Sequence, residues 1–498
     1  MKPPPLPAAI FAIGLCAGQA VFTLLVYQSN TALLNRLEAI AGAGYLVVPN
    51  ARIMASLDAF LPAFCGGLFF TLTAGAGLVL GSFILIYLWR FVFAGRPEVF
   101  LIMVILWETG IYKAAQTGAP ILLIALFTGL PLLILALMVK WTKASERAAG
   151  WRLVLPHLLA ILVIAGIWLP NLNAEVFINI RDKILLSNPV GQKINSFYYR
   201  YTLYPAEAFK SFSQKQINPA HIQINDPGLF AEIETALRRE DYLRIPPDFP
   251  ADLAIRKADE TLLFAHKAQN ILEVSVARFL RSPKETLKNF SQKTDQMEFL
   301  RQFTFFSLII VSPLLLYFFV YALVFGLSFW IRRPLRRQAF AAFACVFFAA
   351  AGAFALYPVQ ALPRPDPSPA GLASKLKSDS RKQRIQALKL IDDKDISISD
   401  YEPALIRLAE SPAVAERYWA VKALDNSDSK ETYQILLKRL HDPHPNVVCM
   451  ALYSLGQRNA ERAISEIKHV LRKSEHWYVQ WYAYNALKEL GWVQPESI

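Results

Sequence analysis

The sequence predicts a multi-pass α-helical membrane protein with an α+β extracytoplasmic insert and a C-terminal all-α solenoid. Three observations predict this fold class. Long blocks of apolar residues contain no charge, a stretch of ordinary polarity interrupts these blocks at residues 171–302, and a period of about 32 residues runs through the last quarter of the chain.

The apolar blocks predict membrane spans. Hydrophobic residues make up 54% of the chain and charged residues only 18%, which is more apolar than an ordinary soluble domain. The blocks approach or exceed the ~20 residues that a helix needs to cross a bilayer. We expect seven spans, at about residues 8–28, 63–89, 98–113, 119–139, 153–170, 303–331 and 338–358. The first is expected to stay uncleaved, because its apolar run exceeds the hydrophobic region of a signal peptide.

These spans divide the chain into five regions. We predict a membrane domain of about five spans at 1–170, an α+β domain at 171–302, two further spans at 303–358, a proline-rich linker at 359–370 and a repeat domain at 371–498.

Basic residues predict the orientation of the spans. With a cytoplasmic N-terminus, the short cytoplasmic connections carry eleven lysines and arginines against three on the other side. Such an excess marks the cytoplasmic face. We therefore expect a bacterial inner-membrane protein with residues 171–302 and 359–498 outside the cytoplasm.

The net charge of +13 does not indicate nucleic-acid binding. Residues 171–302 and 371–498 each carry a net charge of only +2, so most of the excess lies in or beside the apolar blocks. A nucleic-acid footprint requires a basic patch on a folded domain.

Glu108 is the ionisable residue that invites a functional interpretation inside a predicted span. A charge at mid-depth is unfavourable by a few kcal/mol on insertion scales. Together with Lys113 and His157 it would fit a proton or ion path. The alternative is that 98–113 is shallow or re-entrant and that Glu108 faces the interface. We favour this alternative, because no second acidic span accompanies Glu108.

The insert at 171–302 shows mixed secondary-structure signals. Asp226-Pro227-Gly228 predicts a turn before an amphipathic helix at 229–239, and 253–264 predicts a hairpin. We expect a long helix at 266–279 and a second helix from Pro283. An aromatic stretch predicts either an interfacial belt or the core of a small domain: Phe197, Tyr198, Tyr199, Tyr201, Tyr204 and Phe209.

No motif in the chain names a chemistry. GxSxG, HExxH and Walker motifs are absent from the sequence, and His221 and His266 stand alone. Three of the four cysteines fall in apolar blocks, which leaves Cys449 without a soluble partner. We therefore predict no catalytic residue, metal ligand or cofactor, and an enzyme is the less favoured class.

The last quarter of the chain repeats itself in two registers. Ala387, Ala420, Ala451 and Ala483 are spaced by 33, 31 and 32 residues, and Leu376, Leu408, Leu440 and Leu471 by 32, 32 and 31. An alanine followed by an aliphatic residue four positions later fits close contact between paired helices. One such unit cannot bury its apolar face alone, so the units must stack.

At these positions the segment resembles the HEAT-like, armadillo-type repeat family, whose second helix reads roughly V-R-x-x-A-x-x-A-L-G. The third unit matches at Val447, Ala451, Leu455 and Gly456. The family's arginine is kept at Arg384 and Arg417, whereas Val448 and Gln480 replace it later. The resemblance implies a curved surface that binds protein partners.

An aromatic cluster in the repeats is the candidate partner surface. It contains Tyr418, Trp419, Trp477, Tyr478, Trp481, Tyr482 and Tyr484. Tryptophan and tyrosine are favoured interface anchors, although several of these rings would equally fill spaces between helices. The run His441-Asp442-Pro443-His444 fits a turn between helices without a metal.

The favoured function is a scaffold that uses its repeats to hold protein partners outside the cytoplasm, with the bilayer as its second partner. A subunit of a membrane transporter or channel is the alternative that Glu108 supports. A membrane enzyme acting on lipid or glycan is a third alternative. It would require polar side chains that converge on a pocket at the membrane surface.

Overall fold

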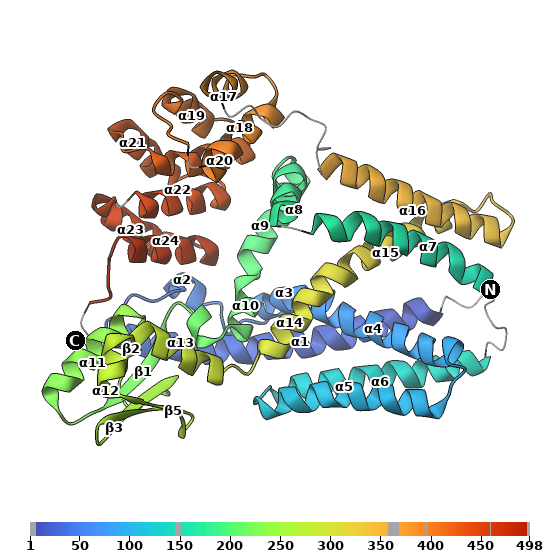
Figure 1. The fold of residues 1–498 in the computed structure, drawn as a ribbon, viewed down its shortest axis with the longest axis horizontal. Coiled ribbons are helices and arrows are strands. Elements are labelled where there is room, and N and C mark those ends of the chain that lie inside the picture. Colours follow the sequence, from blue (N-terminus) through green and yellow to red (C-terminus); the bar gives the residue numbers. More distant parts are fainter. Residues whose placement is uncertain are drawn as a thin grey trace.

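The computed structural model describes residues 6–144, 151–172, 174–356, 368–394, 396–458 and 460–495. Most of the described chain is helical, with one five-stranded sheet and a C-terminal stack of helix pairs (Figure 1). The predicted combination of a helical chain, a small sheet and a C-terminal repeat domain is confirmed. The proline-rich linker predicted at 359–370 lies mostly outside the described residues.

Long apolar helices form the first part of the molecule and return after the insert. They are α1 (Leu6–Gly42), α3 (Phe60–Phe70) continued through η1 (Thr71–Gly75) into α4 (Ala76–Tyr87) and η2 (Leu88–Val92), α5 (Pro97–Gln116), α6 (Ile121–Ala144), α7 (Trp151–Trp168) with η3 (Leu169–Asn171), α14 (Glu298–Phe306) continued through η6 (Ser307–Val311) into α15 (Ser312–Leu327), and α16 (Pro334–Leu356).

Four of these described helical rods are long and apolar enough to cross a membrane: Ala9–Gly42, Phe60–Arg90, Ile121–Lys140 and Glu298–Leu327. The helix at Leu155–Trp168 is apolar but shorter. The predicted spans at 98–113 and 338–358 lie in α5 and α16, which are outside this group of four. The count of seven spans stays a prediction.

Close packing holds α1 against the α3–α4 rod. A Cβ atom on Gly67 would lie 2.9 Å from the backbone nitrogen of Thr23, so only glycine allows this approach. The rings of Phe22 and Phe70 stack beside it, 5.8 Å apart. Small residues at such a crossing let van der Waals contact hold two apolar helices together.

The second half of α1 belongs to a different core. The helix has 37 residues and a length of about 55 Å, well beyond the ~30 Å of a hydrocarbon layer. Leu33, Leu37 and Ile40 are buried in the hydrophobic core that also includes the buried residues of the repeat domain. Arg36 also forms an ion pair with Asp252 of the insert, at 3.2 Å.

The insert contains a mixed sheet with strand order β2-β1-β3-β4-β5. Its strands are β1 (Asn218–Gln223), β2 (Tyr242–Arg244), β3 (Leu253–Ala258), β4 (Thr261–His266) and β5 (Gln269–Ser275). Its helices are α8 (Ala174–Ile180), η4 (Arg181–Leu185), α9 (Pro189–Tyr201), α10 (Leu203–Phe209), η5 (Phe212–Gln214), α11 (Pro227–Arg239), α12 (Val276–Arg281) and α13 (Pro283–Lys293).

The sheet is held by one hydrophobic core. β1 pairs in parallel with β2 and β3, and β3, β4 and β5 form an antiparallel meander. Ile233 of α11, Phe279 of α12 and Phe290 of α13 are fully buried against Ile255 and Phe264 of the sheet. The predicted hairpin at 253–264 and the helix after Asp226 are confirmed, and Asp226 caps α11 by accepting from two backbone amides.

The long helix predicted at 266–279 is wrong. Lys267 and Ala268 adopt left-handed conformations with φ of 47° and 65°, so a tight turn leads back into β5. Helix-favouring residues such as Ala268 and Leu272 suggested the helix. Pairing with β4 outweighs that preference, and the turn lacks the glycine or asparagine that usually marks such a hairpin.

The repeat domain consists of four helix pairs. These are α17 (Pro369–Leu376) with α18 (Arg381–Asp393), α19 (Glu402–Ala409) with α20 (Val414–Ala423) and η7 (Leu424–Asn426), α21 (Lys430–Arg439) with α22 (Pro445–Gln457), and α23 (Ile464–Lys473), preceded by η8 (Glu461–Ala463), with α24 (Trp477–Glu489).

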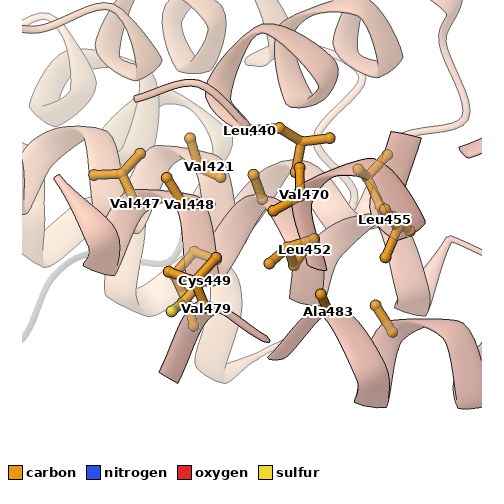
Figure 2. Packing of buried hydrophobic residues seen from close by; sticks show 14 of the residues in the cluster. Val421, Leu440, Val447, Val448, Cys449, Leu452, Leu455, Val470, Val479 and Ala483 are labelled. Atoms are coloured by element: carbon orange, nitrogen blue, oxygen red, sulfur yellow. The ribbon is translucent and has the colours of Figure 1, made fainter. Parts of the chain in front are cut away.

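Both predicted registers lie in the core of these pairs. The four alanines are completely buried, and the four leucines are at most 5% exposed. Figure 2 shows two of them, Leu440 and Ala483, among Val447, Leu452 and Val470 in the core formed by the later pairs. Cys449 is buried among these apolar groups, and burial raises the pKa of its thiol.

The sheet and the repeat domain lie at the same end of the long helices. Figure 1 shows α1, α4, α5 and α6 running away from both, toward the end that carries the N-terminus. The turns between α4 and α5 and between α15 and α16 lie at that opposite end. The insert and the repeat domain are therefore separated from these turns by the length of the long helices.

Candidate functional site: the inner face of the repeat domain

The second helices of the four pairs, α18, α20, α22 and α24, form one layer that we call the inner face. This layer faces η4, α9 and the segment before α2 (Ala51–Met54), as Figure 1 shows. Residues far away in the sequence therefore meet the repeats on the surface where a partner is expected.

Asp182 of η4 connects the first two repeat units. Its carboxylate accepts a 2.8 Å hydrogen bond from Trp419 Nε1 and lies 2.9 Å from the Lys389 ammonium. Arg181 pairs with the same carboxylate at 2.8 Å and lies over the Tyr418 ring, 4.0 Å from its centroid. Burial opposes the charge on Arg181, but Tyr418 and Asp182 outweigh it and raise the pKa of Arg181.

Helix α9 contacts the last two units. Asn195 donates to Asn446 Oδ1 at 2.7 Å, and Asn446 donates to the Tyr199 hydroxyl at 2.8 Å. Both asparagines are at most 1% exposed. The Tyr199 ring also packs on Tyr478, with centroids 4.7 Å apart, and burial raises the pKa of Tyr199. These bonds satisfy polar groups that would be unfavourable if buried alone.

Asn50 joins α2 to the end of α23 in the fourth unit. Its side-chain oxygen accepts from the amides of Arg52 and Ile53, which caps α2. Its side-chain nitrogen lies 2.9–3.1 Å from the carbonyl oxygens of Leu471, Arg472 and Ser474, at the end of α23. The terminal carbonyls of a helix have no partner inside that helix, so Asn50 satisfies them from another part of the chain.

The insert contacts the other side of α24. Asp241 accepts a 2.6 Å hydrogen bond from the Tyr484 hydroxyl and pairs with Lys488 at 2.7 Å. Burial raises the pKa of Asp241, although Lys488 and the Tyr484 hydroxyl lower it in part. Gln216 donates to the backbone oxygen of Trp481 at 3.1 Å.

One part of the inner face remains open. A pocket of about 520 Å³ lies between α22, α24 and the segment at 213–216. Tyr453, Trp481 and Tyr482 form its aromatic walls, and Lys488 and Glu489 are at its polar rim. Most of the other lining residues are polar, and aromatic side chains beside polar groups are typical of protein interfaces.

The structure separates the predicted aromatic cluster into two sets. Trp481 and Tyr482 are half-buried and line the open pocket. The others contact this chain itself: Tyr418 and Trp419 meet η4, Trp477 meets Tyr204, and Tyr478 meets α9. Tyr484 also lines the pocket, but it is buried and its hydroxyl donates to Asp241. The aromatic stretch at 197–209 thus has a role that neither interpretation of the sequence foresaw, since Tyr199 and Tyr204 hold the repeat domain.

Sequence reasoning missed a recurrent polar contact in the repeats. Arg384, Arg417 and Gln480 each donate to the backbone oxygen six residues earlier, at Ser378, Ser411 and Ser474. Arg417 also forms a bidentate pair with Asp442 of the turn at 441–444. Gln480 thus makes the same backbone contact as the arginine that it replaces. Its Oε1 atom also accepts a hydrogen bond from the backbone nitrogen of Asn50.

Glu108 lies far from the inner face. It is exposed on α5 and lines a small pocket of about 90 Å³ with Ser82 and Thr128, from α4 and α6. Within the described residues no group of three or more His, Cys, Asp or Glu side chains could hold a metal ion.

Fold and inner face together define a helical-repeat solenoid that is joined to long apolar helices. The family model for HEAT repeats matches residues 369–448 and 435–498. The C-terminal part of the chain therefore consists of HEAT repeats, and the resemblance inferred from its periodicity is confirmed. Such repeats commonly mediate protein–protein interaction. Comparison with curated proteins gives no match to this chain.

Proposed function

We propose that this protein is a membrane-anchored scaffold whose HEAT repeats bind a protein partner outside the cytoplasm. The four long apolar helices provide the anchor by length and composition. The basic residues at the end opposite the repeats support the orientation, because lysine and arginine collect on the cytoplasmic side.

The open pocket beside Trp481 and Tyr482 carries the proposal for partner binding. Elsewhere the inner face contacts η4, α9 and Asn50, and these contacts join the repeats to the rest of the chain. The pocket leaves two aromatic anchors accessible beside polar groups. Interfaces combine these features, with a buried aromatic anchor and a polar rim.

Photo-crosslinking tests this proposal. A benzophenone amino acid in place of Trp481 should crosslink to a specific protein in native membranes, identified by mass spectrometry. The same group in place of Tyr478 is the matched control, because that ring packs on Tyr199 and should crosslink within the chain. Crosslinks from position 481 only to lipid or to this chain would contradict the proposal.

A further inference from the structure

A second pocket, of about 310 Å³, lies where α1, the sheet and the segment before α14 meet. Its polar lining includes Arg36, Lys210, Lys215, Asp252, His266 and Lys267. These residues come from three separate parts of the chain. The pocket is distinct from the one beside Trp481, although Lys215 contributes to both.

The apolar lining places this pocket at the ends of the long helices. Leu25 and Ser29 lie where the apolar run of α1 gives way to polar residues. Pro120 directly precedes α6, and Met297 directly precedes α14. In a bilayer crossed by these helices, the pocket would lie at the depth of the lipid headgroups.

Both carboxylates of the pocket lining already have a cation. Asp252 pairs with Arg36 at 3.2 Å, and Asp295 pairs with Arg301. Lys210 of the lining pairs at 2.9 Å with Glu207, which is outside it. Within the described chain neither Lys215 nor Lys267 forms an ion pair. The group formed by these eight residues therefore carries two positive charges in excess.

Lys215 has a partly desolvated ammonium without an ion-pair partner among the described residues. Its ammonium lies 5.0 Å from the centroid of the Phe212 ring. Burial lowers the pKa of Lys215, and Asp252 offsets this only in part. An anion that enters the pocket would restore the interactions that a desolvated ammonium has lost.

His266 provides a further polar atom. Its Nδ1 donates to the backbone oxygen of Asp252 at 2.8 Å, because a carbonyl oxygen can only accept. This bond fixes the ring beside Phe212, whose centroid lies 5.2 Å away. In the neutral ring the other nitrogen can only accept, so it would contact a protonated oxygen of a phosphate.

We propose that this pocket binds the phosphate group of a small anionic ligand, with Lys215 and Lys267 as its cationic contacts. Lysine is a common phosphate ligand because its ammonium offers several donors around one charge. The apolar wall at Leu25 and Met297 suits the first methylene groups of phospholipid acyl chains, and a soluble phosphate would use the same two lysines. The inference goes beyond scaffolding, since the ligand is a small molecule.

Two binding measurements on the purified full-length protein test the site. In detergent, inorganic phosphate is titrated by calorimetry. In nanodiscs, native mass spectrometry compares retention of phosphatidylglycerol with that of phosphatidylcholine. Binding in the first measurement alone identifies a soluble phosphate, and selective retention in the second identifies a lipid headgroup.

Lys215→Gln and Lys267→Gln should each weaken the observed binding about tenfold or more, as expected for loss of a charged hydrogen bond. Lys267 is exposed, so its variant stays informative if Lys215→Gln disturbs folding. Lys257→Gln, at an exposed position in the same sheet and outside the pocket, is the matched control. Absence of binding in both measurements, or an equal loss in the control, would overturn the proposal.

Discussion

Asp182 of the insert contacts two repeat units through one buried carboxylate. One buried carboxylate meets Arg181, Lys389 and Trp419. Removing the charge from such a set leaves buried cations without a partner. We expect Asp182→Asn to destabilise the docked arrangement by about 3 kcal/mol, measured by urea unfolding and by faster hydrogen exchange in α9 and α20.

Glu410→Gln is the control for that change. Glu410 pairs with Lys438 at 2.5 Å, with both side chains largely exposed. A surface pair of this kind contributes less than about 1 kcal/mol. An equal loss of stability in the two variants would show that Asp182 has no special role.

His444 gives the repeat domain a dependence on pH. Burial lowers its pKa from 6.5 to about 4, and Arg417 and His476 oppose its charge while Asp442 favours it. The unfolded chain therefore binds a proton that the folded chain does not, in the interval between these two values. We expect the free energy of unfolding to fall as the pH drops through this interval. Urea unfolding monitored by tryptophan fluorescence measures this change.

Replacing His444 should weaken this dependence on pH. His444→Gln removes one titrating group and leaves that of His476, whose pKa burial also lowers. His441→Gln changes an exposed imidazole three residues away and should preserve the dependence. An unchanged dependence in His444→Gln would contradict the assignment.

At the scale of the element, the repeat alanines mark the places where helices touch. Ala451 is completely buried in α22. Adding three carbon atoms there overfills the core, so Ala451→Leu should lower stability by about 1–3 kcal/mol in thermal or urea unfolding. Ala370→Leu, on an exposed position of α17, should be nearly neutral. Equal effects at both positions would contradict the packing role of the alanine register.

The repeat elements were predictable because their pattern is local and recurs four times. Ala387 and Leu376 predict a pair of packed helices within one unit, and the same positions recur in the next unit. The strand β5 was not predictable, because Lys267 and Ala268 carry no ordinary turn signal and pairing with β4 decides the conformation. The helix capped by Asp226 was predictable, because its cap lies in adjacent residues.

The site was less predictable than the fold. Aromatic residues on α24 indicated a contact surface, and Trp481 and Tyr482 line a pocket. Which rings face a separate partner depends on contacts across hundreds of residues, such as Asn50 with Leu471 and Asn195 with Asn446. A repeating pattern in the sequence cannot predict such contacts. Each depends on a single polar residue, which lies in an irregular segment or in a helix of the insert and does not recur.

At the scale of the whole molecule, contacts outside the inner face also join the insert, the repeat domain and α1. Asp241 links the insert to α24, Gln494 exchanges two hydrogen bonds with Leu46, and Arg36 links α1 to the sheet. A rigid connection of this kind fits an anchored scaffold, because it fixes the open pocket relative to the long helices.

Cysteine accessibility most directly tests the proposal that this protein is anchored in a membrane and that its repeats lie outside the cytoplasm. With the four native cysteines replaced by alanine, Lys438→Cys on the exposed side of α21 and Arg96→Cys between α4 and α5 are each treated with a membrane-impermeant maleimide in spheroplasts. We predict labelling of position 438 in intact spheroplasts and of position 96 only after permeabilisation. The reverse pattern, or labelling of both positions without permeabilisation, would contradict the account.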